Sequence, residues 1–134
     1  MKEFTVDIKR TITLTEEDVE DLVVTALEGG IGYWACLDNR GQRFKDAPKD
    51  EPVSITASKI LMDGGDLMFL DNDDRRSRWS FSIGKLMEGI KLYIEQGHDV
   101  YNVFSGDEVD MGMCDVECAD IIFQLGMFGE LVYG

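Results

Sequence analysis

Three arginines lie close together in the middle of the sequence, Arg75, Arg76 and Arg78, and Trp79 follows them. Guanidinium groups bind phosphate oxygens through paired hydrogen bonds, and an aromatic ring can stack on a nucleotide base. The segment therefore suggests a nucleotide site in which an arginine binds the phosphate and a ring stacks on the base. The rings that could serve are Tyr33, Trp34 and Trp79.

The arginines also have a plainer interpretation. Three carboxylates lie in the same segment, at Asp71, Asp73 and Asp74. Exposed arginines beside carboxylates form ion pairs that contribute little to stability and imply no ligand. The sequence leaves both readings open, and the ion-pair reading is the more economical one.

Acidic residues dominate the composition, with 27 Asp and Glu against 13 Lys and Arg and a formal net charge of −14. Such a surface repels nucleic acid and anionic membranes, so we expect neither as a direct partner. It either keeps the protein soluble or imitates nucleic acid on a partner with a basic surface. The carboxylates expected to contact such a partner are Glu16, Glu17, Asp18, Glu20, Asp21, Asp107, Glu108 and Asp110.

No residue pattern calls for catalysis, a metal ion or a cofactor. A calcium loop starting in the acidic turn would need glycine and glutamate where the chain has Arg76 and Ser82. A zinc site built from Cys114, Cys118 and the single histidine, His98, would still need an acidic ligand. We therefore predict a protein that is not an enzyme and that binds no metal or cofactor.

Residues 25–34 read TALEGGIGYW and raise the question of where the first helix ends. The glycines lack the spacing of a dinucleotide-binding loop, and they follow a predicted helix instead of a strand. Apolar residues keep the helical period through Trp34 to Leu37. This pattern predicts one helix that continues to Leu37, in which Gly29, Gly30 and Gly32 let another backbone approach closely.

The elements that must position these residues follow from local patterns. Apolar residues alternate over residues 4–14, which predicts a strand, and Thr15 with Asp18 predicts the start of a helix. The other expected elements are a loop over 38–52, a helix capped by Ser54 or else a strand over 54–63, a hairpin of strands 66–71 and 78–82, a helix from Ser82 to Gly97, and a last helix capped by Asp115. Gly89 inside the helix from Ser82 suggests that another element packs close to it.

These elements predict an α+β fold. The expected sheet is small and antiparallel, made of the N-terminal strand plus the central hairpin, with three to four helices packed mainly on one face. At 134 residues the chain should form a single domain, residues 1–134. No apolar run is long enough to span a bilayer, and three cysteines form no disulfide framework, so we expect a cytoplasmic protein.

The segments ALEGGIGYW and ADIIFQLGMFGELVYG resemble a family of small acidic proteins encoded by bacteriophages and prophages. The resemblance covers most of the chain, except residues 38–60 and the arginine-rich turn. It implies a phage origin and a host bacterial cytosol as the place of action. It assigns no reaction and no catalytic residue.

Size, charge and this resemblance suggest a counter-defence inhibitor, similar in kind to anti-CRISPR proteins, that binds a nucleic-acid-handling host protein. One alternative is a sponge that sequesters a nucleotide immune signal, with Arg75, Arg76 or Arg78 on the phosphate. Another is a structural or regulatory phage protein that forms a homodimer through its apolar C-terminus.

Overall fold

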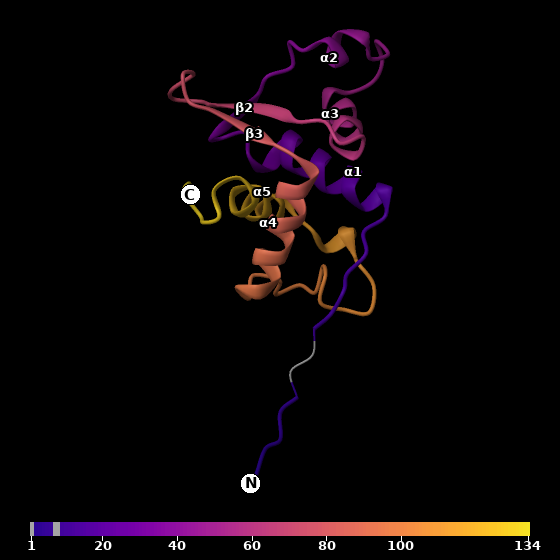
Figure 1. Cartoon of the computed structure of the whole chain (residues 1–134), viewed down its shortest axis with the longest axis vertical. Coiled ribbons are helices and arrows are strands. Elements are labelled where there is room, and N and C mark those ends of the chain that lie inside the picture. The colour runs from indigo at the N-terminus through magenta and orange to yellow at the C-terminus, as the bar shows by residue number, and fades with distance from the viewer. Residues whose placement is uncertain (1, 7–8) are drawn as a thin grey trace.

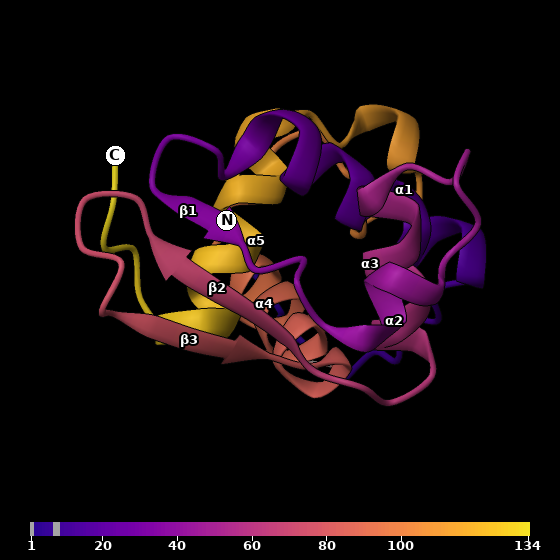
Figure 2. The same ribbon diagram turned by 90° about the horizontal axis from the view of Figure 1, so that it is seen from above.

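The computed structural model describes residues 2–6 and 9–134 and has an α+β fold, as predicted. Three antiparallel strands form one sheet in the order β1-β2-β3 (Figure 1). Their bounds are Ala35–Leu37 for β1, Leu67–Asp71 for β2 and Arg78–Phe81 for β3. The helix pair α4 and α5 packs on one face of this sheet, whereas the opposite face is open (Figure 2).

Five α-helices and two short helical turns accompany the sheet in the described structure. They are α1 Glu16–Thr25, the π-helical turn η1 Ala26–Gly30, α2 Gln42–Asp46, α3 Val53–Met62, α4 Ile83–Glu95, the 3-10 turn η2 Met111–Met113 and α5 Val116–Phe128. None of the helices formed by residues 2–6 and 9–134 has the length and apolar character needed to cross a membrane.

Helix starts follow the predicted caps in three cases. Thr15 and Asp18 form the capping box of α1, Ser82 accepts a hydrogen bond from the backbone of α4, and Asp115 does the same for α5. The cap predicted for α3 is wrong, because Pro52 occupies that position. A short helix, α2, also interrupts the predicted loop over 38–52.

The predicted N-terminal strand is wrong for the residues that the structure describes. Residues 4–6 and 9–14 form no strand, and Asp7 and Ile8 lie outside the described residues. Phe4 and Val6 are 90% and 83% exposed, and this segment runs away from the body of the protein (Figure 1). Alternating apolar residues specify a strand only where a partner strand is within reach, and β1 takes that place beside β2.

The predicted continuation of the first helix to Leu37 is also wrong. The helix widens into η1, where Ile31 N donates to Ala26 O over 2.9 Å, and ends at Gly30. The chain then turns and enters β1. The predicted close approach of a backbone is confirmed at Gly30, where a Cβ would lie 2.9 Å from the carbonyl oxygen of Val116 in α5. It is wrong for Gly29, which faces the Val116 side chain, and for Gly32, which has no atom within 4 Å of a Cβ position.

Helices α4 and α5 cross at a pair of glycines. A Cβ at Gly89 would overlap the carbonyl oxygen of Ile122, and a Cβ at Gly126 would overlap the carbonyl oxygen of Lys85. The close contact predicted from Gly89 is therefore confirmed. It brings Phe123 of α5 against the sheet, where its ring stacks on Phe81 at 4.6 Å.

Candidate functional site

The acidic residues of the first helix lie on its solvent-facing side. Val19, Leu22 and Val23 turn the other side of α1 into the core, so the carboxylates between them face outward. Glu16, Glu17 and Asp21 are exposed, whereas Asp18 and Glu20 are partly buried. Asp18 also accepts a hydrogen bond from Thr15 N at 2.9 Å, which gives it a capping role within α1.

The second acidic segment, residues 107–110, is held in a loop built around Asp99. The Asp99 carboxylate accepts hydrogen bonds from Val103 N, Phe104 N and the Ser105 hydroxyl, at 2.7 to 2.8 Å. Arg10 adds a hydrogen bond of 2.9 Å to the carbonyl oxygen of Ser105 and thereby ties the N-terminal segment to this loop.

The structure places the two acidic segments on neighbouring elements. Asp110 caps η2 by accepting from Gly112 N at 3.2 Å, and η2 contacts α1. Asp107, Glu108 and Asp110 are all exposed. Within residues 2–6 and 9–134, none of the eight predicted carboxylates forms an ion pair, since the observed pairs involve Asp38, Glu51, Asp63 and Asp74. We refer to these eight carboxylates together as the acidic face.

The arginines of the hairpin do not behave as the ion-pair reading predicts, except at one position. Arg76 pairs with Asp74 at 3.1 Å, within the turn. Arg78 instead pairs at 2.9 Å with Asp38, which follows β1. No ion pair is found for Arg75 with any residue of the described chain.

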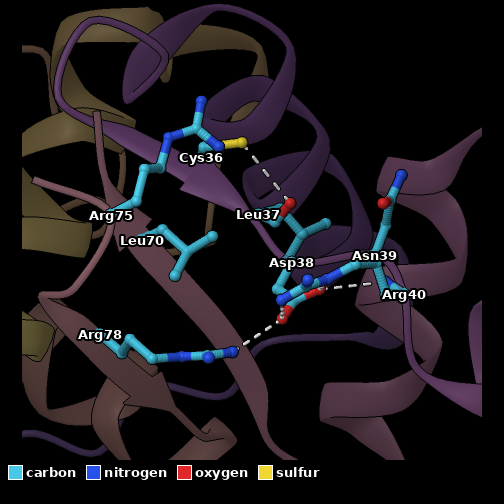
Figure 3. Close-up of a pocket in the computed structure, with 8 residues that line it drawn as sticks. All are labelled: Cys36, Leu37, Asp38, Asn39, Arg40, Leu70, Arg75 and Arg78. Carbon is cyan, nitrogen blue, oxygen red and sulfur yellow. Dashed lines mark hydrogen bonds and ion pairs between the residues drawn. The ribbon is translucent and has the colours of Figure 1, made fainter. Parts of the chain in front are cut away.

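Arg75 and Arg78 line an open pocket of about 460 Å³ on the uncovered face of the sheet (Figure 3). Its other lining residues are Cys36, Leu37, Asp38, Asn39, Arg40 and Leu70. Arginines outnumber carboxylates here by three to one, although the whole chain is strongly acidic.

Asp38 organises one wall of this pocket. Arg40 donates to both of its carboxylate oxygens, each at 2.9 Å, and Arg78 donates to one of them. Hydrogen bonding to Arg40 holds the pKa of Asp38 well below its usual range, despite the opposing effect of burial. Asp38 therefore stays charged and fixes the guanidinium group of Arg78.

The aromatic residues predicted to stack on a base lie elsewhere, because none of Tyr33, Trp34 and Trp79 lines this pocket. Trp34 is only 2% exposed and stacks on Tyr133 at 4.9 Å. Trp79 packs edge-on against Phe128 at 5.1 Å. The nucleotide hypothesis requires these rings beside Arg75 or Arg78, and the structure places them outside the pocket that these arginines line.

Tyr33 and Trp34 instead belong to a buried hydrogen-bond network that the sequence reading missed. Asp120 of α5, only 9% exposed, accepts from the Tyr33 hydroxyl at 2.6 Å, from Trp34 Nε1 at 2.8 Å and from Gln124 Nε2 at 2.9 Å. The detectable signal was the polar pair Asp120 and Gln124, spaced by one helical turn inside the apolar last helix.

Gln124 extends this network to the C-terminal tail. Its side-chain oxygen accepts from the backbone nitrogens of Val132 and Tyr133, at 2.9 and 2.8 Å. The Tyr133 hydroxyl then donates to Asp71 of β2 at 2.7 Å. The tail is therefore attached to its own chain, although Leu131 and Val132 remain 47% and 52% exposed.

The described residues offer no cluster of three or more His, Cys, Asp or Glu side chains with the geometry of a metal site. Cys114 and Cys118 are buried free thiols whose sulfur atoms lie 2.9 Å apart. The Cys114 thiol donates to the sulfur of Cys118, which raises the pKa of Cys114 and lowers the pKa of Cys118. Cys36 is the third free cysteine and is partly buried.

No protein-family model matches the chain, and no curated protein or solved structure matches it. The segments ALEGGIGYW and ADIIFQLGMFGELVYG pack together in the structure: Gly30 contacts the start of α5, and Trp34 donates a hydrogen bond to Asp120. These contacts join η1, β1, α5 and the C-terminal tail.

Proposed function

We propose that this protein is a phage-encoded binding protein without enzymatic activity, which inhibits a nucleic-acid-handling host protein by occupying its basic groove. The observation that supports this proposal is the acidic face. Two segments almost 90 residues apart in the sequence contribute carboxylates, one on α1 and the other in the loop that leads into η2, which contacts α1. Within the described structure no ion pair is recorded for these carboxylates.

A carboxylate that forms no ion pair within its own chain is available to bind a cation of a partner protein. An ion pair inside the chain would have to be broken before a partner's arginine or lysine could bind, whereas these carboxylates lose only their hydration. Long-range attraction would also speed the encounter with a basic groove, and salt would weaken it. Binding of this kind competes directly with the phosphate groups of nucleic acid.

Five members of the acidic face are best placed to carry this role, because they are exposed and no hydrogen bond is recorded for their side chains within the described structure: Glu16, Glu17, Asp21, Asp107 and Glu108. Asp18 and Asp110 already cap local structure. Glu20 is partly buried. We therefore expect the first five to contribute most of the binding energy.

The test begins with affinity purification from host cells to identify the partner, followed by binding measurements with a triple variant. Glu17→Gln, Asp21→Asn and Glu108→Gln remove three charges from the acidic face. A matched control removes three charges from exposed positions outside it, with Asp66→Asn, Glu88→Gln and Glu130→Gln. Both variants have the same net charge, so only the position of the lost charges differs.

We expect the acidic-face variant to bind the partner at least about tenfold more weakly, which corresponds to about 1.4 kcal/mol. The control should stay within about threefold of the unmodified protein. Added nucleic acid should displace the protein from its partner, and higher salt should weaken binding. Equal losses in the two variants, or binding that does not change with salt, would contradict the proposal.

A further inference from the structure

The pocket beside β1 owes its composition to the register of the sheet. Cys36 pairs with Leu70, and Leu70 pairs with Arg78, so these three side chains share the face that no helix covers. Asp38 follows directly after β1, and Arg75 lies in the turn before β3. Segments from three parts of the sequence thus meet at one hollow of about 460 Å³ (Figure 3).

The guanidinium groups in this pocket have unused hydrogen-bonding capacity. Arg78 uses one nitrogen on Asp38, and no ion pair or hydrogen bond is recorded for the Arg75 side chain within residues 2–6 and 9–134. Figure 3 shows Arg75 and Arg78 on either side of Leu70, with the Arg75 guanidinium directed toward Cys36 and Arg78 held toward Asp38. Each guanidinium carries five donors, so most of those on Arg78 and all those on Arg75 are available to a ligand.

We infer that this pocket binds a small phosphate monoester, whose phosphate is bound by the guanidinium group of Arg75 and whose body rests on Leu70, toward Arg78. A guanidinium group binds two oxygens of a phosphate through parallel hydrogen bonds. Arg40 and Asp38 act as positioning residues that hold Arg78 in place. The absence of Trp34, Trp79 and Tyr33 from the lining argues against recognition of a nucleotide base.

This inference does not depend on the acidic face. A chain with a net charge of −14 repels free phosphate over most of its surface, so saturable binding requires a local excess of positive charge. The three arginines of the pocket supply that excess. The half-buried Cys36 thiol at its edge provides a convenient reporter of occupancy.

The test titrates the protein with inorganic phosphate and with phenyl phosphate while backbone amide NMR signals are recorded. We expect saturable shifts confined to Cys36, Leu37, Arg75, Arg78 and their neighbours, and slower labelling of Cys36 when either ligand is bound. Phenyl phosphate should bind more tightly, because its ring covers the apolar floor. Shifts that do not saturate, or that spread over the whole protein, would overturn the inference.

Two variants distinguish the pocket from general electrostatics. Arg75→Gln removes an exposed arginine that lines the pocket, and Arg76→Gln removes its exposed neighbour, which pairs with Asp74 outside the pocket. We expect Arg75→Gln to weaken phosphate binding about tenfold and Arg76→Gln to change it less than about twofold. Equal losses would refute a specific site. A nucleoside monophosphate that binds while phenyl phosphate does not would show base recognition and also overturn the inference.

Discussion

Replacement of Asp120 tests whether its buried hydrogen-bond network holds the segment around Tyr33 and Trp34 against α5. Its carboxylate accepts three hydrogen bonds, from Tyr33, Trp34 and Gln124. In Asp120→Ala the buried Trp34 N–H loses its only recorded acceptor. The Gln124 amide keeps a weaker bond of 3.3 Å to the carbonyl oxygen of Tyr133, and the Tyr33 hydroxyl can turn toward water because Tyr33 is 55% exposed.

The loss in free energy of unfolding expected for Asp120→Ala follows from the hydrogen bonds that these donors lose. A buried donor left without an acceptor costs about 1 to 3 kcal/mol, and the weakened Gln124 bond adds about 1 kcal/mol. Asp120→Ala should therefore lower the free energy of unfolding by about 3 kcal/mol. Asp120→Asn should cost only about 1 kcal/mol, because its amide oxygen still accepts from Trp34 and Gln124 and its NH2 group can donate to the Tyr33 oxygen.

Chemical denaturation followed by tryptophan fluorescence measures both values. The matched control is Asp107→Ala, an exposed aspartate with no recorded hydrogen bond from its side chain, which should change stability by less than about 0.5 kcal/mol. If Asp120→Ala is no more costly than this control, the network does not hold the segments together. Equal costs for the Ala and Asn variants would refute the argument from unsatisfied donors.

The same replacement changes how stability depends on alkaline pH. Partial burial, and then the hydrogen bond and charge of Asp120, raise the pKa of Tyr33 to about 12. A raised pKa means that the folded state favours protonated Tyr33, so this stabilisation is complete below about pH 10 and is lost as the pH rises toward 12. In Asp120→Asn the pKa of Tyr33 should fall, as measured by phenolate absorbance. An unchanged titration would exclude the contact with Asp120.

Two further predictions concern packing and thiol exposure. Gly89→Ala should destabilise the protein by about 1 to 3 kcal/mol, because the added methyl group meets the backbone of α5. Gly84→Ala is the control: its methyl group has room, so this variant should be neutral or stabilising by up to about 1 kcal/mol. Equal unfolding midpoints for the two variants would contradict the close crossing of α4 and α5. A thiol reagent should modify Cys36 quickly in the native protein and modify Cys114 and Cys118 only after denaturation, because these two are buried. Rapid reaction of more than one thiol would refute this burial.

Structural features that depend on a few neighbouring residues could be predicted from the sequence. The capping box at Thr15 and Asp18, the caps at Ser82 and Asp115 and the central hairpin all formed as predicted. Gly89 also indicated that another element packs closely at this position, and in the structure that element is α5. Such features depend on local hydrogen bonds and on the space available at one position, so the tertiary fold did not need to be known.

The sheet shows where local pattern fails. Residues 4–14 have a stronger strand pattern than residues 35–37, but it is Ala35–Leu37 that forms the third strand of the sheet. The chain turns after η1, and this turn places Ala35–Leu37 beside β2. A π-helical turn also ended a helix whose apolar period continued further along the chain. Periodicity records which side chains avoid water, and it does not record which neighbour covers them.

By itself, then, the sequence determined the α+β class, the helix starts, the hairpin and the excess of negative charge, because each depends on composition or on residues close together in the chain. Only the tertiary structure decided that Asp120 is a buried acceptor, that Arg78 pairs with Asp38, and that η2, which follows the second acidic segment, contacts α1. Those contacts join residues from about 40 to almost 90 positions apart. Such pairings are set by packing of the whole chain around one core, which no local pattern encodes.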